Sequence, residues 1–477
     1  MFRKTPKQTT RPWALVAVLG LAGTSASFMQ TLVVPIQNHL PVLVDASRSS
    51  TAWVLSIALL AAAVTTPISG RLGDIYGKRR VALTLLCLLV LGSLIAAVSQ
   101  GLGWLLVGRA LQGVSMGIIA VGMSIMSDQP DPKQRITGIA FISASLGFGG
   151  ALALPLSAWI VEAGDWKLLF WSSAALGILN LIFVWRVVPR SVGTQQRLDG
   201  LGAVGLAVGV SGILIAVSQG PVWGWASVQT LGTFLGGLIA LIAWGVYELR
   251  VVDPIVDLRI LARRPLLLVN LGTIALGFSF FVSEVAFLQI LELPAETEAG
   301  LGLTMLWASM ALVPSAVAMM AVAPLAGRLT SRYGGRVATS IGALTAAVAY
   351  ALTIIWHDEV WHIVAFSSLL LAGVAIAYAA IPTLVIAQVS RDSTGSATGV
   401  NALMRSIGTS SGATVTGMVL AASSVSVDGN EVPEPSGFVF VFVLGLIAAL
   451  LSAALVWYST GRNTGSLGPA DRVPVNS

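Results

Sequence analysis

Charge is scarce in this sequence: Asp, Glu, Lys and Arg make up only 10% of its 477 residues. A soluble domain carries about 25% charged residues, because it must cover a water-facing surface. Hydrophobic residues instead reach 56%, and the mean hydropathy is +0.86. Long apolar runs recur along the whole chain, which is typical of a protein that crosses a membrane many times. We therefore expect a membrane protein and not a soluble globular domain.

Cysteine and histidine are almost absent, which excludes further classes of site. The single Cys87 cannot form an intramolecular disulfide. His39, His357 and His362 have no cysteine or close acidic cluster beside them, so we expect no metal site and no cofactor. Lys and Arg exceed Asp and Glu by 27 to 21, but they form no patch that would bind nucleic acid.

Two short motifs with enzymatic precedents occur in the wrong context. "GLGAVG" at 200–205 fits a dinucleotide-binding pattern, but no strand precedes it and it opens an apolar helix. "GVSMG" at 113–117 fits the nucleophile elbow of hydrolases, which requires a strand-to-helix turn, yet it lies inside an apolar run. The chain is therefore not predicted to be an enzyme.

Fourteen apolar stretches are long enough to cross a bilayer, since a hydrocarbon core of roughly 30 Å needs about 20 apolar helical residues. The first contains "TSAS", which resembles a signal cleavage site, but another span follows it and we interpret it as an uncleaved helix. The predicted all-α spans cover residues 13–36, 51–70, 81–99, 103–125, 136–161, 167–188, 199–219, 228–248, 265–290, 301–327, 336–356, 361–385, 398–423 and 436–458.

The basic residues agree with this count. With fourteen spans, Lys and Arg fall on one side of the membrane with few exceptions. The exceptions are Arg48 and Lys167 on the opposite side, and Arg109 and Arg405 inside spans. Because cytoplasmic loops are enriched in Lys and Arg, both termini are predicted to be cytoplasmic.

One motif occurs twice. "GRLGDIYGKRR" at 70–80 is repeated in part as "GRLTSRYGGR" at 327–336, with Ser331 in place of Asp74. Each copy follows the second span of a six-span set, if spans 1–6 and 9–14 form the two sets. Two parallel six-helix halves, related by an axis along the membrane normal, are the arrangement of major-facilitator transporters.

The first copy resembles the signature loop of the major facilitator superfamily, G-x-L-x-D-x-x-G-[RK]-[RK]. "GRALQGVSMG" at 108–117 is similar to the fourth-span motif of that family, R-x-x-Q-G. The six, two and six spans resemble the fourteen-span drug:proton antiporter branch. The resemblance implies an N-terminal half at 1–190, two inserted helices with a linker at 191–264, and a C-terminal half at 265–477. It also implies a monomeric multidrug efflux protein of a bacterial inner membrane, with small molecules, protons and lipids as partners.

The signature loop is also implied to hold the two halves together in one conformation and to release them in the other. Its glycines let helix ends approach closely, and its aspartate suits a helix N-terminus, where the dipole favours an anion. Its basic residues can meet anionic lipid heads, and a role as topological anchors alone is the alternative. The conformational residues are Gly70, Arg71, Asp74, Gly77, Lys78 and Arg79.

Polar residues inside the spans are few and costly. For Arg109 and Gln112 in span 4, the resemblance implies proton transfer or support of the cavity. The alternative is an arginine that snorkels to the interface or that makes structural hydrogen bonds to carbonyls. Asn401 and Arg405, near the cytoplasmic end of span 13, are interpreted as an interhelical tether or a substrate contact. Glu284 is the only acid well inside a span, in a helix that lines the cavity in this fold; a carboxylate that reaches water at the outer end is the alternative.

Two departures from the family pattern bear on proton coupling. Met29 stands where antiporters of this branch carry a first-span aspartate, and "GFGGALALPLS" at 147–157 reorders the fifth-span motif. The sequence predicts export of amphipathic or lipophilic compounds by proton antiport and alternating access. An uncoupled facilitator, or a non-transporting lipid-interacting or sensory relative, is the alternative. The predicted cavity residues are Glu284, Arg109, Gln112, Gln30, Asn270 and Ser279.

Overall fold

The computed structural model describes residues 12–36, 40–51, 53–162, 164–191, 193–194, 198–295, 297, 300–390, 393–427 and 430–459. Both chain ends with their basic residues, together with His39, Arg197 and Arg391, lie outside the described residues.

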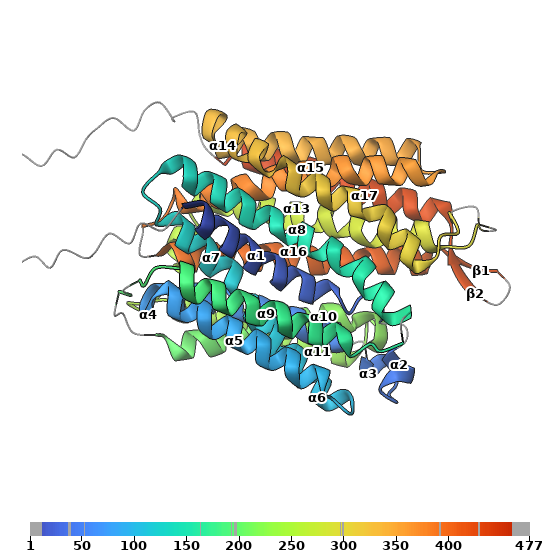
Figure 1. Ribbon diagram of the computed structural model, residues 1–477, viewed down its shortest axis with the longest axis horizontal. Helices are drawn as coiled ribbons and strands as arrows, with labels where there is room; N and C mark the ends of the chain where they lie inside the picture. Colours follow the sequence, from blue (N-terminus) through green and yellow to red (C-terminus); the bar gives the residue numbers. More distant parts are fainter. Residues whose placement is uncertain are drawn as a thin grey trace, which may run out of the picture.

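Long helices that run side by side make up most of the structure (Figure 1). A first group of helices, all of them before residue 190, shares one hydrophobic core. Two short helices, α2 (Leu40–Leu43) and α3 (Arg48–Thr51), lie between α1 and α4. The first group consists of α1 (Pro12–Thr31), α4 (Trp53–Tyr76), α5 (Lys78–Ala97), α6 (Leu102–Ser115), α7 (Ile118–Ser127), α8 (Pro132–Glu162) and α9 (Leu168–Val187).

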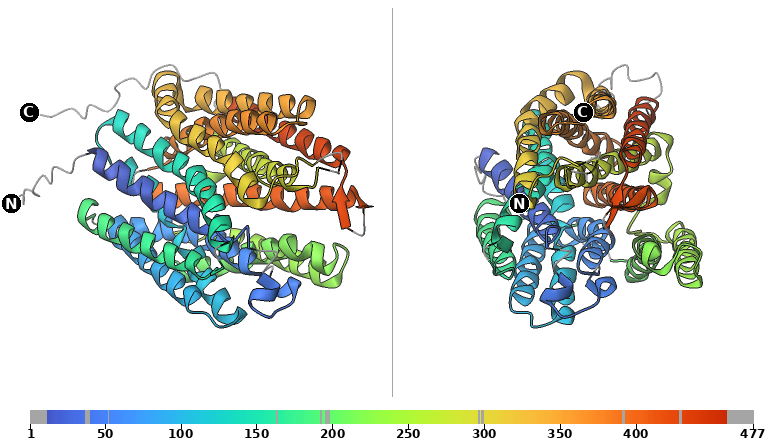
Figure 2. Two further views of the ribbon diagram at one scale, coloured as in Figure 1. Left: turned by 45° about the vertical axis from the view of Figure 1, so that its right-hand side comes forward. Right: turned by 90° about the vertical axis from the view of Figure 1, so that its right-hand side faces the viewer.

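A second group of helices has a separate core. It contains α13 (Arg264–Glu292), α14 (Met305–Ile355), α15 (Val360–Ile386), α16 (Thr394–Ala422) and α17 (Pro435–Trp457). Between the groups in sequence lie α10 (Gly200–Trp223) and α11 (Val228–Glu248), followed by the short α12 (Leu258–Leu261). The pair α10–α11 stands to one side of the bundle in the right-hand view of Figure 2, where α10 packs against α4 and α16.

Twelve helices in the described part of the chain are long and apolar enough to cross a membrane, by length and composition. One of them, α14, has 51 residues, and its helical geometry is interrupted at Gly334 (φ 84°, ψ 159°). A further helix, α16, has 29 residues but is not among the twelve, because its many Gly, Ser and Thr residues make it less apolar.

The repeated motif forms the same bend in both copies. Gly77 between α4 and α5 has φ 97°, and Gly334 inside α14 has φ 84°. L side chains rarely adopt this region, whereas glycine enters it without steric cost. Most of the predicted loop at 70–80 is therefore helical, and the chain reverses at the single residue Gly77.

A small hairpin departs from the predicted all-α fold. Strands β1 (Ser424–Val427) and β2 (Asn430–Pro433) pair in antiparallel register, with Val425 opposite Val432. The alternating "SVSV" sequence favours a strand, and the Asp-Gly pair that follows it is typical of two-residue hairpins. The hairpin lies at the end of the bundle where α2 and α3 also lie (Figure 1).

Candidate functional site

Asp74, in the last turn of α4, lies against the first turn of α16. Its Oδ1 accepts a hydrogen bond from the Gly395 amide (3.3 Å) and its Oδ2 accepts one from the Ser396 amide (3.1 Å). The first amides of a helix lack partners within the helix and carry its positive dipole end, so a carboxylate is stabilised there. Asp74 thus links the first helix group to the second, at a site where its side chain is only 5% exposed.

The backbones around this carboxylate are also in close contact. A Cβ on Gly70 would collide with the Gly395 backbone, and a Cβ on Gly399 would lie 2.6 Å from the Cα of Pro67. From α7, the Ser124 hydroxyl hydrogen-bonds that of Thr394 at 3.1 Å. We call these contacts of α4 and α7 with the start of α16 the clasp, and they close this end of the bundle.

The basic residues of the motif act within the first group. The Lys78 ammonium lies 2.7 Å from both carboxylate oxygens of Asp128 and donates to the Ser124 carbonyl (3.1 Å). The Arg79 guanidinium donates to the Trp185 carbonyl of α9. Both side chains therefore brace α5 against α7 and α9. Arg71 is buried, and its Nε has no hydrogen-bond partner within the described ranges.

The segment after α11 packs on the clasp. The Ser396 hydroxyl donates to the Ile255 carbonyl at 2.5 Å, and Glu248 Oε1 accepts a hydrogen bond from the Val256 amide at 2.8 Å. Ile255 and Val256 are buried against Val400 of α16. Sequence reasoning gave this segment no role, although an acid at the end of an apolar span, Glu248, is a signal that could have been noticed.

In the part of the chain that the structure describes, Ser331 of the second copy makes no link comparable to that of Asp74. The Ser331 hydroxyl is exposed and donates to the Arg328 carbonyl of its own helix (3.0 Å). A Cβ on Gly327 would lie 3.5 Å from Thr137 of α8, which is an ordinary contact distance. The two copies therefore share a backbone bend but differ in the contacts they make across the groups.

Arg109 of α6 is fully buried and bonds to backbone. Its Nη1 donates to the Met29 carbonyl (2.9 Å) and to Gln112 Oε1 (2.8 Å), and its Nε donates to the Val54 carbonyl (3.1 Å). Gln112 in turn donates to the Ser93 hydroxyl (2.8 Å). These bonds join α1, α4, α5 and α6, which matches the structural alternative stated for Arg109.

Asn270 and Ser279 of α13 were predicted to line the cavity, but they lie in contacts between helices. Asn401 donates to Asn270 Oδ1 (3.0 Å) and to the Thr273 hydroxyl (2.9 Å), so this trio ties α13 to α16. Ser279 is fully buried, and its carbonyl accepts the hydroxyl hydrogen of Tyr350.

A cavity of about 110 Å³ lies between the two helix groups. It is lined by residues of α1, α4, α7, α8, α13, α14, α15 and α16. Its lining includes two charged side chains, Glu284 and Arg405, together with Gln30, Tyr378 and the hydroxyl groups of several serine and threonine residues. Glu284 and Gln30 were predicted there. Arg405 was expected near the cytoplasmic end of its span. Tyr378 was not predicted, because a tyrosine in an apolar helix is usually a residue that packs in the core.

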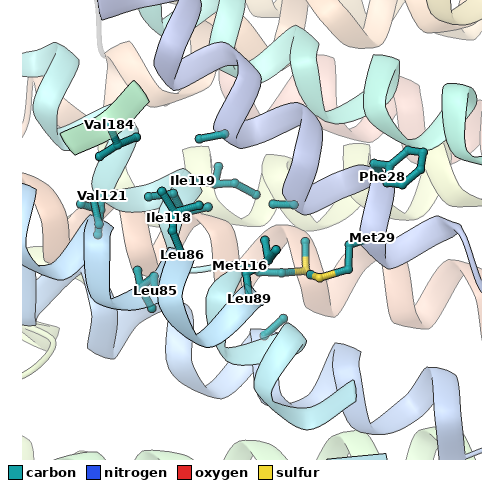
Figure 3. Packing of buried hydrophobic residues seen from close by; sticks show 14 of the residues in the cluster. Phe28, Met29, Leu85, Leu86, Leu89, Met116, Ile118, Ile119, Val121 and Val184 are labelled. Carbon is teal, nitrogen blue, oxygen red and sulfur yellow. The ribbon is translucent and has the colours of Figure 1, made fainter. Parts of the chain in front are cut away.

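The position that departs from the family pattern is apolar in the structure. Met29 is 1% exposed and belongs to the core of the first group. Figure 3 shows its side chain near Met116, among the apolar side chains of neighbouring helices. No charge from α1 therefore faces the Arg109 guanidinium, which bonds the Met29 carbonyl instead.

The sequence profile of the Major Facilitator Superfamily matches residues 16–413 and, in a second match, 308–472. The chain belongs to this superfamily. Superfamily members are transporters and not enzymes, so the chain is a multi-span membrane transporter.

Its relatives within the superfamily include several drug transporters. The chain is 26% identical to the multidrug transporter protein MdtP of Bacillus subtilis over 78% of this chain and 69% of MdtP. It is 27% identical to the lincomycin resistance protein LmrB of Listeria monocytogenes over 72% of each chain. An uncharacterised superfamily transporter of Bacillus subtilis, YhcA, is 27% identical over 78% of this chain and 69% of YhcA.

Solved structures of the superfamily have the same fold. The human organic anion transporter MFSD10 superposes with a TM-score of 0.64 at 15% identity, covering 93% of this chain and 99% of MFSD10. The proton:xylose symporter XylE, bound to 6-bromo-6-deoxy-D-glucose, also gives 0.64 at 14% identity, with 94% and 96% covered. At these identities the likeness concerns the fold alone.

Proposed function

We propose that this superfamily member is a fourteen-span exporter of amphipathic organic compounds, which exchanges them for protons by alternating access. The observation that carries the proposal is a cavity between two helix groups that contains Glu284 and is closed at one end by the clasp. The names of MdtP and LmrB, which describe multidrug transport and antibiotic resistance, support a drug as substrate.

Two features favour fourteen spans. The break at Gly334 divides the 51 residues of α14 into segments 305–333 and 335–355, and each is at least as long as the roughly 20 residues that a bilayer requires. Helix α16 extends over 29 residues and packs along α13 and α4, so it crosses the same depth of the bundle as they do. The halves are then residues 1–190 and 265–477, with 191–264 inserted between them.

The clasp end faces the cytoplasm in this proposal, because the Arg and Lys residues of both motif copies lie there and cytoplasmic loops are enriched in them. The structure then corresponds to a conformation closed toward the cytoplasm. Opening the clasp would expose the cavity to a cytoplasmic substrate.

Glu284 is the proposed proton carrier. Among the described residues it is the acid that lines the cavity, and Phe280 and Phe281 of the same helix line the cavity beside it. An uncoupled facilitator is the second candidate, and the apolar packing of Met29 favours it, because the first helix group then offers the cavity no acid.

The test uses purified protein in vesicles that are acidic inside, with the ethyl ester of rhodamine B as a permanently charged, lipophilic probe. Proton efflux through an antiporter should drive the dye into the vesicles. We expect Glu284→Gln to abolish this uphill uptake and to make the downhill exchange that remains independent of pH. Glu292→Gln, at the exposed end of the same helix, is the matched control and should resemble the wild type. Uphill uptake by Glu284→Gln would exclude Glu284 as the carrier, and none by the wild type would favour the facilitator.

A further inference from the structure

Two opposite charges line the cavity without pairing. Arg405 of α16 and Glu284 of α13 both contribute to its wall. Among the described residues, no ion pair within 4.0 Å involves either of them. The two helices approach closely at Gly277, where a Cβ would lie 2.8 Å from the Arg405 carbonyl, and Glu284 lies two turns further along α13. The cavity thus contains one cation and one anion at separate positions.

The positive side of the cavity also has a free hydrogen-bond donor. The Arg405 guanidinium lies 5.5 Å from the centroid of the Tyr378 ring. The Tyr378 hydroxyl is buried and has no hydrogen-bond partner among the residues that the structure describes. Buried polar groups are nearly always hydrogen-bonded, and an ionised side chain within the membrane is normally paired. Arg405 and Tyr378 together therefore suit an incoming anionic group.

We propose that the transported compounds are amphipathic zwitterions. Their anionic group binds the Arg405 guanidinium and the Tyr378 hydroxyl, and their cationic group binds the Glu284 carboxylate. An arginine fork matches the two oxygens of a carboxylate and binds them more strongly than it binds neutral acceptors. This inference rests on the proposed function and narrows its substrate class.

The arrangement is compatible with proton exchange. The titratable groups near Glu284 are Arg405 on α16, Tyr378 on α15 and Tyr350 on α14. Arginine keeps its charge at every physiological pH. A proton on Glu284 therefore removes the partner of the substrate's cationic group and weakens binding, while Arg405 continues to select for an anion. A compound with only a cationic group leaves Arg405 unpaired in the site.

The cavity is too small for a substrate in this conformation. Drug-sized ligands occupy pockets of roughly 300–1,000 Å³, and the volume here is about 110 Å³. A zwitterion would therefore enter only after the clasp opens and the helix groups separate. Transport, and not binding to the closed state, is the appropriate measurement.

The experiment compares rhodamine B, which carries a carboxylate and a delocalised cation, with its ethyl ester, which lacks the anionic group. Initial uptake rates are measured over a range of dye concentrations in inside-acid vesicles. We expect the wild type to show kcat/KM at least tenfold higher for rhodamine B than for the ester. A site built for a charged partner discriminates strongly against an analogue that lacks it.

Variants connect the preference to the residues. Arg405→Gln should lower kcat/KM at least tenfold for rhodamine B and change it little for the ester, and Arg405→Lys should restore part of the loss. Tyr378→Phe keeps the ring beside Arg405 and removes only the hydroxyl, so it should also weaken transport of rhodamine B alone. Arg332→Gln, an exposed arginine outside the cavity, is the matched control.

The outcomes separate this inference from the proposed function. Equal transport of both dyes by the wild type, or equal losses for both dyes in Arg405→Gln and Tyr378→Phe, would overturn the zwitterion inference and leave export standing. Absence of pH-driven uptake of either dye would contradict the proposed function itself, and with it the inference.

Discussion

At the scale of single residues, the two copies of the motif differ in the space around their first glycine. At Gly70 any side chain would meet the Gly395 backbone, because α4 and α16 touch there. At Gly327 an added Cβ would lie 3.5 Å from Thr137, a distance at which side chains ordinarily pack. A backbone contact thus requires glycine at position 70, whereas position 327 has room for a methyl group.

We predict that Gly70→Ala opens the clasp and that Gly327→Ala does not. Overpacking costs about 1–3 kcal/mol, and each 1.4 kcal/mol changes a population about tenfold. Distances between spin labels on the clasp ends of α4 and α16 would report the open fraction. A closed clasp in Gly70→Ala, or similar opening in both variants, would show that the close approach is not needed for closure.

The sequence predicted the chemical role of several residues, but it did not predict which residues they contact. An aspartate after a glycine motif predicted an anion at a helix N-terminus, and Asp74 is found there. Which helix it meets was not predictable, because Gly395 lies 321 residues further along the chain and only the fold brings them together. Arg109 was ambiguous for a related reason: a carbonyl acceptor such as that of Met29 leaves no mark in the sequence.

At the scale of elements, hydropathy located most helices but not their ends or their breaks. The predicted span at 103–125 is divided into α6 and α7, and the spans at 301–327 and 336–356 form one long helix bent at Gly334. The hairpin β1–β2 was missed because four-residue strands give a weak periodic signal. Local sequence therefore determined where the chain is apolar and where a glycine allows a bend, while it did not determine the ends of each helix.

The segment from α11 to α12 is an element whose role only the structure indicates. Its buried Glu248 side chain accepts a hydrogen bond from the Val256 amide and so fixes the backbone that accepts the Ser396 hydroxyl hydrogen. Ser396 is also one of the two residues whose amides bind Asp74. The inserted helices are thus connected to the clasp through one short chain of hydrogen bonds.

We predict that Glu248→Ala loosens this segment and the start of α16. The change leaves the buried Val256 amide without an acceptor, which costs about 1–3 kcal/mol. Hydrogen exchange of residues 249–257 and of the first turn of α16 should become faster, and transport should slow. Glu248→Gln keeps an oxygen in the same place and should exchange at the wild-type rate. Equal exchange in the two variants would mean that the bond does not hold the segment.

At the scale of the whole molecule, two helix groups with separate cores meet, and the small cavity that contains Glu284 lies between them. Their contacts at the clasp are made largely by glycine backbones, hydroxyl groups and one carboxylate. Away from the clasp, an apolar cluster that includes Ala140 of α8, Ala326 of α14 and Ile376 of α15 also joins the groups, and each group keeps a larger core of its own. The arrangement suits two groups that move as units.

This arrangement predicts that a covalent link across the clasp stops transport. In a Cys87→Ser background, Ser124→Cys and Thr394→Cys would place two thiols where the hydroxyl oxygens are now 3.1 Å apart, close enough for a disulfide to form with small adjustments. Oxidation should then hold α7 against α16 and abolish dye transport, and reduction should restore it. The control pair is Ser25→Cys with Asn180→Cys, whose side chains hydrogen-bond between α1 and α9 within the first group. Oxidising that pair should leave transport near its reduced level, because the two helices move together. If the cross-linked clasp still transported dye, the two groups would not need to separate there, and closure by the clasp could not be a step of the transport cycle.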